Sequence, residues 1–391
     1  MKIKSLSGAD AAGEAMRQIN PDVAPVYPIT PQTPIMHKFA QFVADGDVST
    51  EMIRVESEHS AMSAAIGSCA AGARTMTATS SQGLALMIEI VYIAPPLRLP
   101  IVMNLVNRAL SGPINIHCDH SDGMLCRDSG WIQLYSEDAQ EVYDNNLIAV
   151  RLAESEKVRL PAMVCQDGFV TSHEVMRVDI IEDAEVKKFI GEFKPNYPLL
   201  DTAHPVTYGA IDMFDYYFEH KRQQSEALSF VFEAFNKISE EYSKISGRKL
   251  KLIEGYKLED AEIAVVCLNS AAGSARYVID ELRVKGIKAG LLKLRMFRPF
   301  PKVQLVEALK HLKAFAVLDR AESFSLMGGP LFIDVRSSFY GCKNQPKTVD
   351  YIYGLGGREL TLEHIRKVFS ELEQIKKQED YDQIRYLGVR E

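Results

Sequence analysis

A short apolar strand that stops at a proline and turns into a helix constrains the fold of this chain more than any other feature. Residues Val23–Tyr27 form the apolar run, Pro28 ends it, and Thr33-Pro34 supplies a helix cap followed by a proline suited to the first helical turn. Apolar residues then recur at helical spacing, so the residues between strand and helix, including Thr30, are predicted to lie in a tight turn. Side chains at the ends of successive strands are where alternating α/β proteins place their chemistry.

The next unit repeats this arrangement. Ile53–Val55 is a predicted strand, Ser57 a predicted N-cap, and Glu58 the first residue of a helix with small and apolar residues on one face. Acidic residues are common in a first helical turn because they complement the helix dipole. Taken alone, Glu58 therefore favours a structural interpretation.

The first half of the chain alternates apolar strand candidates with amphipathic helices. Strands that alternate with helices form a parallel sheet covered on both faces, and we predict that α/β architecture here. The predicted strands are Val23–Tyr27, Ile53–Val55, Arg74–Ala78, Ile101–Val106, Trp131–Leu134 and Ala162–Cys165. The predicted helices are Ala9–Ile19, Glu58–Ala71, Leu84–Ala94 and Glu137–Glu154.

A second α/β unit follows in the last third of the chain. Ile263–Leu268 is a buried type of strand, Asn269–Ala275 is a turn of small residues into a helix, and Ala289–Leu294 is the next strand. With 391 residues the chain is long enough for two domains with cores of their own. We place these domains at 1–249 and 250–391.

The stretch between the two units has a different character. A proline-containing irregular segment gives way to a predicted amphipathic helix over about 213–246. Its apolar stripe is predicted to pack on the first domain, and a subunit-docking surface is the alternative. The stripe consists of Phe214, Phe218, Leu228, Phe232 and Phe235.

Composition and missing motifs exclude several classes of function. A net charge of −7 argues against a nucleic-acid surface, and the six cysteines include no Cys-x-x-Cys pair that would indicate a zinc or iron–sulfur site. The run Gly354–Gly357 lacks the full dinucleotide fingerprint, so we interpret it as a turn. No apolar run approaches the roughly 20 residues that span a bilayer, and no signal pattern begins the chain. We expect a cytoplasmic protein without membrane contact.

Four short blocks resemble a known family when they are taken together. Their order and spacing are similar to those of the 2-oxoacid:ferredoxin oxidoreductases and, within that family, to the separate alpha subunits of pyruvate:ferredoxin oxidoreductases. The resemblance runs nearly end to end. It implies a thiamine-diphosphate-binding domain of the pyrimidine type with a parallel sheet, followed by a transketolase C-terminal-like α/β domain. The blocks are Tyr27–Pro31, Ser57–Ala61, Ser80–Leu84, and Asn107–Leu110 with Cys118–Asp122.

The resemblance implies roles for three residues. Glu58 matches the carboxylate that hydrogen-bonds the aminopyrimidine ring of thiamine diphosphate, which makes it the catalytic and cofactor-binding candidate. Arg108 matches the arginine that binds the substrate carboxylate, and Thr30 matches the threonine that hydrogen-bonds the substrate. Without the resemblance, an arginine at a strand end favours a surface ion pair, and a threonine in a turn favours a bond to local backbone.

Two neighbouring motifs keep open interpretations. His59 follows Glu58, but adjacent helical residues point in different directions, so His59 is expected to cap the helix or to face a subunit interface. Asp119–Asp122 combines two carboxylates with an imidazole. We favour a structural or pocket-shaping role for this segment over a metal site.

The sequence also indicates what this chain lacks. It has neither a Gly-Asp-Gly motif nor ferredoxin-type cysteines. The resemblance therefore implies a beta subunit that holds the diphosphate, Mg²⁺ and a 4Fe–4S cluster, with gamma and delta subunits completing the complex and passing electrons to ferredoxin. No metal site is expected in this chain itself.

The reaction implied is the reversible oxidative decarboxylation of pyruvate with coenzyme A to acetyl-CoA and CO₂, coupled to reduction of ferredoxin. The same chemistry on another 2-oxoacid, such as 2-oxoglutarate or a branched-chain 2-oxoacid, is the first alternative. A non-catalytic scaffold subunit is the second. A scaffold would not need Thr30, Glu58 and Arg108 together.

Overall fold

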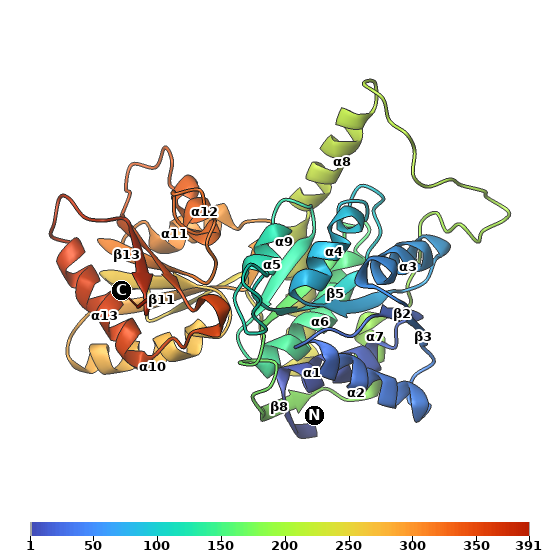
Figure 1. Cartoon of the computed structure of the whole chain (residues 1–391), viewed down its shortest axis with the longest axis horizontal. Coiled ribbons are helices and arrows are strands. Elements are labelled where there is room, and N and C mark those ends of the chain that lie inside the picture. Colours follow the sequence, from blue (N-terminus) through green and yellow to red (C-terminus); the bar gives the residue numbers. More distant parts are fainter. Residues whose placement is uncertain (1, 391) are drawn as a thin grey trace.

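The computed structural model describes residues 2–390 and contains two α/β lobes, drawn in blue to green and in yellow to red in Figure 1. Most of the first lobe alternates strands and helices as the sequence predicts. Its first elements are β1 (Lys2–Leu6), α1 (Gly8–Ile19), β2 (Val23–Val26), α2 (Thr33–Ala44), β3 (Glu51–Arg54), α3 (Glu58–Ala71), β4 (Met76–Thr79) and α4 (Ser81–Val91). They are followed by β5 (Val102–Asn107), α5 (Ser121–Leu125), β6 (Ile132–Ser136), α6 (Ala139–Ala153), β7 (Ala162–Asp167), β8 (Met176–Ile180), α7 (Asp183–Ile190), α8 (Tyr217–Ser229) and α9 (Val231–Ser246).

The main sheet of the first lobe has the order β12-β6-β7-β5-β4, and β4 to β7 run parallel. A parallel pair, β2-β3, continues it through a bridge between Val23 and Thr75. Alternate residues of β5 enter two different cores, with Val102 and Val106 facing α1 and α6, and Met103 facing α3 and α4. The predicted parallel sheet covered on both faces is therefore confirmed.

The second lobe is a six-stranded sheet of order β15-β14-β13-β10-β11-β9. Its residues also alternate between two cores, one of which is shared with α3 and α4 of the first lobe. The elements are β9 (Ile253–Tyr256), β10 (Ile263–Cys267), α10 (Ala271–Val284), β11 (Ala289–Leu294), β12 (Met296–Arg298), α11 (Lys302–Leu309), β13 (Ala314–Asp319), α12 (Pro330–Ser338), β14 (Lys347–Tyr353), α13 (Leu362–Ile375) and β15 (Ile384–Leu387).

One strand crosses between the lobes. β12 follows β11 in the chain but pairs antiparallel with β6 of the first sheet. The chain segment of the second lobe thus contributes a strand to the sheet of the first lobe, and the two lobes also share a core. The domain boundary at 249/250 stays a prediction, and residues 296–298 lie with the first lobe.

The predicted single helix over 213–246 is wrong. The structure has two helices, α8 and α9, that meet at Phe230, and α8 projects from the body of the molecule (Figure 1). Phe235 is buried, but Phe214 and Phe218 are 99% and 79% exposed. Periodicity indicates an apolar face without saying what covers it, and α8 has only Gln224 and Ala227 buried.

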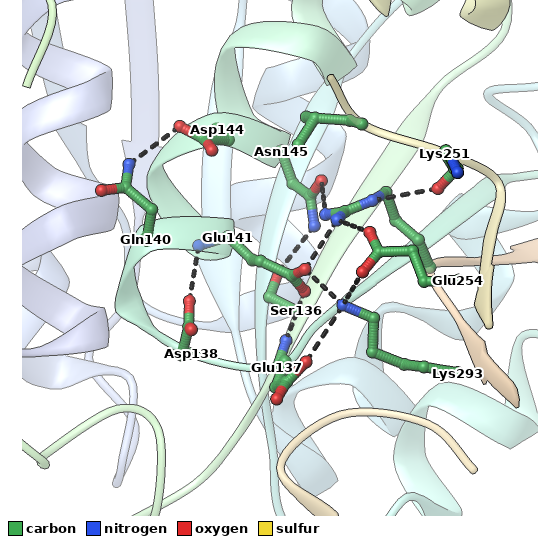
Figure 2. Close-up of polar contacts among 12 residues, drawn as sticks. Ser136, Glu137, Asp138, Gln140, Glu141, Asp144, Asn145, Lys251, Glu254 and Lys293 are labelled. Carbon is green, nitrogen blue, oxygen red and sulfur yellow. Dashed lines mark hydrogen bonds and ion pairs between the residues drawn. The ribbon is translucent and has the colours of Figure 1, made fainter. Parts of the chain in front are cut away.

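Charged side chains between the lobes form a buried network. Lys293 of β11 lies 3.1 Å from Glu137 and 3.0 Å from Glu254, and it also pairs with Glu141 of α6 (Figure 2). Arg295 adds a bond of 2.6 Å to Glu141. Burial opposes the charge on Glu141, but Arg295 and Lys293 outweigh it and lower the pKa of its carboxyl to about 2.

Replacing Glu141 with glutamine is expected to destabilise the chain by about 3 kcal/mol at pH 7, because two buried cations lose their shared partner. The pKa of Glu141 falls from 4.5 to about 2 on folding, so its contribution is complete above pH 4.5 and is lost as the pH falls through 2. Urea unfolding should therefore show a gap between wild type and variant that narrows below pH 4.5. Glu259→Gln, at an exposed position, is the control, and a gap that widens in acid would contradict this account.

Within residues 2–390, the helices are too short or too polar to cross a bilayer.

Candidate active site

The three residues predicted from the sequence all follow strands of the first lobe. Thr30 lies in the turn after β2, Glu58 begins α3 directly after β3, and Arg108 follows β5. Because these strands run parallel within their sheets, the residues lie at carboxyl edges. The structure brings two of them into contact, since Nη1 of Arg108 donates to the carbonyl oxygen of Thr30 at 2.9 Å.

Glu58 is buried without a partner. Its residue is 7% exposed, and its carboxylate makes no hydrogen bond or ion pair with any described residue. Ser57 performs the capping instead, since its hydroxyl accepts from the backbone N–H of Ser60 at 3.2 Å. An acidic residue that merely complements a helix dipole is ordinarily exposed, whereas Glu58 is buried and its carboxylate has no partner within the described chain. The burial of Glu58 points to a ligand.

Gly83 provides the space beside Glu58. A Cβ atom at Gly83 would lie 2.8 Å from Oε1 of Glu58 and 2.5 Å from Oγ1 of Thr79. Oγ1 of Thr79 and Oγ of Ser80 are themselves buried without hydrogen-bond partners. The start of α3 and the start of α4 therefore enclose a group of polar atoms that have no hydrogen-bond partners within the described chain.

Arg108 is a buried cation without an anion. It is 7% exposed, and its Nε donates to the carbonyl of Asn115 at 2.9 Å while Nη1 donates to Thr30. No carboxylate of residues 2–390 pairs with its guanidinium. The surface ion pair expected for an isolated arginine is thus not present, and the unneutralised charge suits an anionic ligand.

Asp122 joins the site together. Its fully buried carboxylate accepts from the backbone N–H of Ser81 at 2.9 Å, from that of Arg108 at 2.9 Å and from Nδ2 of Asn107 at 2.8 Å. Burial raises the pKa of Asp122 to about 6 in spite of these bonds. Asp122 therefore ties the start of α4 to the end of β5, which is the structural role favoured for this segment.

The second lobe holds the loop that follows Arg108. Nδ2 of Asn115 donates to the carbonyl of Gly356 at 3.0 Å, and the N–H of Gly357 donates to the carbonyl of Cys118 at 2.7 Å. Gly357 has φ +81°, and a Cβ there would lie 2.3 Å from Cβ of His117. The run Gly354–Gly357 is no dinucleotide loop but a single 3-10 turn, η1 (Leu355–Gly357), preceded by Gly354, and sequence reasoning missed its contact with the loop that follows Arg108.

Asp167, at the end of β7, was also missed. It is fully buried and accepts from Nη1 of Arg320 at 2.9 Å and from Nδ2 of Asn269 at 2.9 Å, while its Oδ1 lies 2.7 Å from Nε2 of His120. Burial opposes its charge, but Arg320 and His120 outweigh it and hold the pKa of Asp167 well below its usual value. A lone aspartate after a strand gives no sequence signal for such a contact between lobes.

Neither the cluster of Cys118, His120 and Asp167 nor His59 is a candidate for catalysis or metal binding. Cys118, His120 and Asp167 place potential ligand atoms within 4.8 Å of one another, but Arg320 already supplies the positive charge that a metal would bring. His59 is a surface residue whose Nε2 lies 3.4 Å from a carboxylate oxygen of Glu89. The proposed capping role of His59 is wrong, because Ser57 is the cap.

Family models match both lobes. A model described as pyruvate flavodoxin/ferredoxin oxidoreductase, thiamine-diphosphate-binding, matches residues 14–243, and one described as pyruvate:ferredoxin oxidoreductase core domain II matches residues 261–365.

Curated relatives cover nearly the whole chain. It is 59% identical to pyruvate synthase subunit PorA of Thermotoga maritima over 99% of this chain and 98% of the relative. It is 45% identical to PorA of Methanocaldococcus jannaschii over 100% and 99% of the two chains. Identity to the ketoisovalerate oxidoreductase subunit VorA of Pyrococcus horikoshii is 39%, over 95% and 94%.

Solved structures share the fold. A 2-oxoglutarate:ferredoxin oxidoreductase of Magnetococcus marinus, with 2-oxoglutarate, coenzyme A and succinyl-CoA bound, superposes with a TM-score of 0.76 at 20% identity, over 95% of this chain and 65% of that one. A split-gene transketolase superposes with a TM-score of 0.58 at 14% identity, over 96% and 100%. Both similarities agree with the predicted combination of a thiamine-type domain and a transketolase-like domain.

Proposed function

Since the chain belongs to the pyruvate flavodoxin/ferredoxin oxidoreductase family, we propose that it is the alpha subunit of a pyruvate synthase complex. The complex interconverts pyruvate and coenzyme A with acetyl-CoA and CO₂ and exchanges electrons with ferredoxin. The observation that carries the proposal is the pair of unneutralised buried charges, Glu58 and Arg108, at the sheet edge of a chain that matches pyruvate synthase subunits end to end.

The residues around Glu58 fit the aminopyrimidine end of thiamine diphosphate. The unpaired carboxylate, the unsatisfied hydroxyls of Thr79 and Ser80, and the space left by Gly83 offer polar partners beside a planar, nitrogen-rich ring. The cofactor supplies carbanion stabilisation when bound. In our proposal, an Oε atom of Glu58 would share a proton with a ring nitrogen of the cofactor, since the carboxylate has no hydrogen-bond partner among the described residues.

Arg108 and Thr30 are proposed to bind the 2-oxoacid. Two nitrogens of Arg108 are fixed by the carbonyls of Asn115 and Thr30, which orients the guanidinium and leaves Nη2 for the substrate carboxylate. The hydroxyl of Thr30 makes no hydrogen bond to the described chain, so it is free to donate to the 2-oxo group of pyruvate.

The remaining components are proposed to lie in partner subunits. The chain has no Gly-Asp-Gly motif for a diphosphate and its metal. We assign the diphosphate, Mg²⁺ and a proximal 4Fe–4S cluster to a beta subunit, and ferredoxin reduction to gamma and delta subunits. The complex is proposed to be cytoplasmic.

A second candidate substrate is a branched-chain 2-oxoacid, because the chain is 39% identical to a ketoisovalerate oxidoreductase subunit. Initial rates of methyl viologen reduction by the assembled complex, with coenzyme A, separate the candidates. We expect kcat/KM for pyruvate to exceed that for 2-oxoisovalerate and 2-oxoglutarate at least tenfold. A preference for either competitor would reassign the substrate.

The single chain serves as the matched comparison. Purified alone, it is expected to show no turnover, no micromolar binding of thiamine diphosphate with Mg²⁺ in calorimetry, and no iron–sulfur absorbance. Half of the binding groups are missing, and the diphosphate and its metal carry most of the charge that a site must satisfy. Turnover by the lone chain would mean that it is a complete enzyme.

A further inference from the structure

A cavity lies in the first lobe, under the irregular segment between α7 and α8. We call residues 191–216 the arm; Figure 1 shows it as the long yellow-green loop that reaches away from the body. The cavity has a volume of about 540 Å³. Its outer wall comes from the arm, and its inner wall from the segment before β5, the segment after α6, and Cys69 near the end of α3.

Two adjacent arginines that form no ion pair with a described residue lie at this cavity, which Glu156 also lines. Arg159 is 9% exposed, its Nη2 donates to the carbonyl of Lys194 at 2.5 Å, and its Nε is buried without a hydrogen-bond partner. Arg98 donates through Nη2 to the carbonyl of Val158 at 2.8 Å and through Nε to that of Arg159 at 3.2 Å. No carboxylate among residues 2–390 forms an ion pair with either guanidinium. Burial and repulsion by Arg159 lower the pKa of Arg98.

A third arginine nearby, Arg74, is neutralised by a carboxylate and serves as a comparison for Arg159. The guanidinium carbon of Arg74 lies 6.0 Å from the ring centroid of Phe193, and that of Arg159 lies 5.5 Å from the same centroid. Arg74 is neutralised by Glu154, with bonds of 2.7 and 2.9 Å. Arg159 contacts the same aromatic ring but has no such carboxylate. Of these two arginines on the same ring, only Arg159, which lines the cavity, has no carboxylate partner.

The rest of the lining mixes apolar side chains with polar ones, the latter including Glu156, Asn196, Thr207 and Gln223. The inner wall presents Leu97, Leu99 and Pro100, and the arm adds aromatic and aliphatic side chains. The hydroxyl of Tyr208 donates to the carbonyl of Tyr197 at 3.0 Å, which joins two parts of the arm that both line the cavity. The site thus combines a buried arginine with apolar surface from residues 97–100 and the arm, as small-molecule pockets commonly do, although Glu156 lies in the same lining.

We propose that this cavity binds a small amphiphilic anion, with its carboxylate or phosphate on Arg159 and its apolar chain between the arm and residues 97–100. The site is separate from the proposed active site and does not rest on it. Cys69 lies 11 residues beyond Glu58 on α3, which corresponds to about 16 Å along the helix. The ligand would therefore contact the far end of the helix that begins with Glu58.

Equilibrium dialysis of the assembled complex with octanoate, octyl phosphate and uncharged octanamide tests the proposal. We expect one octanoate or octyl phosphate per chain, with octanamide binding at least tenfold more weakly. The tighter of the two anions identifies the head group. If octanamide bound as tightly as the two anions, the arginines would not be recognising a negative charge, and the proposal would be overturned.

Variants locate the site. Arg159→Gln is expected to weaken octanoate binding at least tenfold while pyruvate turnover stays within twofold of wild type. Val206→Glu, which adds a carboxylate to the arm wall, should have the same effect without altering a buried arginine. Arg177→Gln, at an exposed arginine of β8, is the control. Wild-type affinity for octanoate in both cavity variants would refute a small-molecule site. Octanoate binding by the free chain but not by the complex would also refute it, because a partner subunit would then fill the cavity.

Discussion

Glu58→Gln in the assembled complex is expected to lower kcat by about two to four decades, the range typical for loss of a proton-transfer group. Glutamine keeps the shape of the side chain but cannot hold a proton at the same atom. The variant is also expected to be at least as stable as the wild type. Glu58 is a buried residue whose carboxylate has no hydrogen-bond or ion-pair partner among the described residues, so a neutral amide at this position breaks no hydrogen bond.

That combination distinguishes a catalytic residue from a structural one. Turnover and thermal unfolding should be measured on the same preparations, with Glu56→Gln as the matched control, because Glu56 is an exposed glutamate two positions earlier. A variant that keeps turnover within threefold of wild type, or one that loses activity only because it unfolds, would remove Glu58 from the mechanism.

Arg108→Ala is expected to reduce kcat/KM for pyruvate about ten- to a hundredfold, the cost of a lost charge-assisted hydrogen bond. Arg108→Lys should recover little of this, because a single ammonium nitrogen cannot reproduce the planar fork in which Nε and Nη1 bind the two carbonyls and Nη2 stays free for the substrate. Thr30→Val is expected to have a smaller, severalfold effect, since it removes a neutral hydroxyl and keeps the backbone carbonyl that orients Arg108.

Initial rates over a range of pyruvate concentrations check this prediction. Arg127→Ala, which removes a partly exposed arginine of the same lobe, is the control. Were Arg108→Ala and Thr30→Val both to retain the wild-type kcat/KM, pyruvate would bind elsewhere in the complex.

Local signals predicted most of the first lobe. Helix α3 has the predicted bounds because Ser57 caps its start and Gly72, with φ 108°, ends it. Proposed site residues at strand ends could be located for the same reason, since each follows an apolar run that a turn residue interrupts. Cap and turn chemistry acts over a few residues, and sequence reports it directly.

Contacts across the chain could not be predicted in this way. Asn115 and Gly356 are 241 positions apart, and Asp167 and Arg320 are 153 positions apart. Nothing in the local pattern marks either pair. Likewise, Phe214 and Phe218 have the spacing of a buried stripe, but the residues that would cover them are absent from that face of the described chain.

The bond between Asn115 and Gly356 has a consequence for how substrate choice can evolve. The peptide group of Asn115 fixes Nε of Arg108, and its side chain is fixed in turn by a glycine turn of the second lobe. Substitutions around that turn would move the arginine without changing any residue that meets the substrate. A family built in this way can adjust its selectivity among 2-oxoacids from the second lobe, so the origin of a new preference should be sought there as well as at the strand ends.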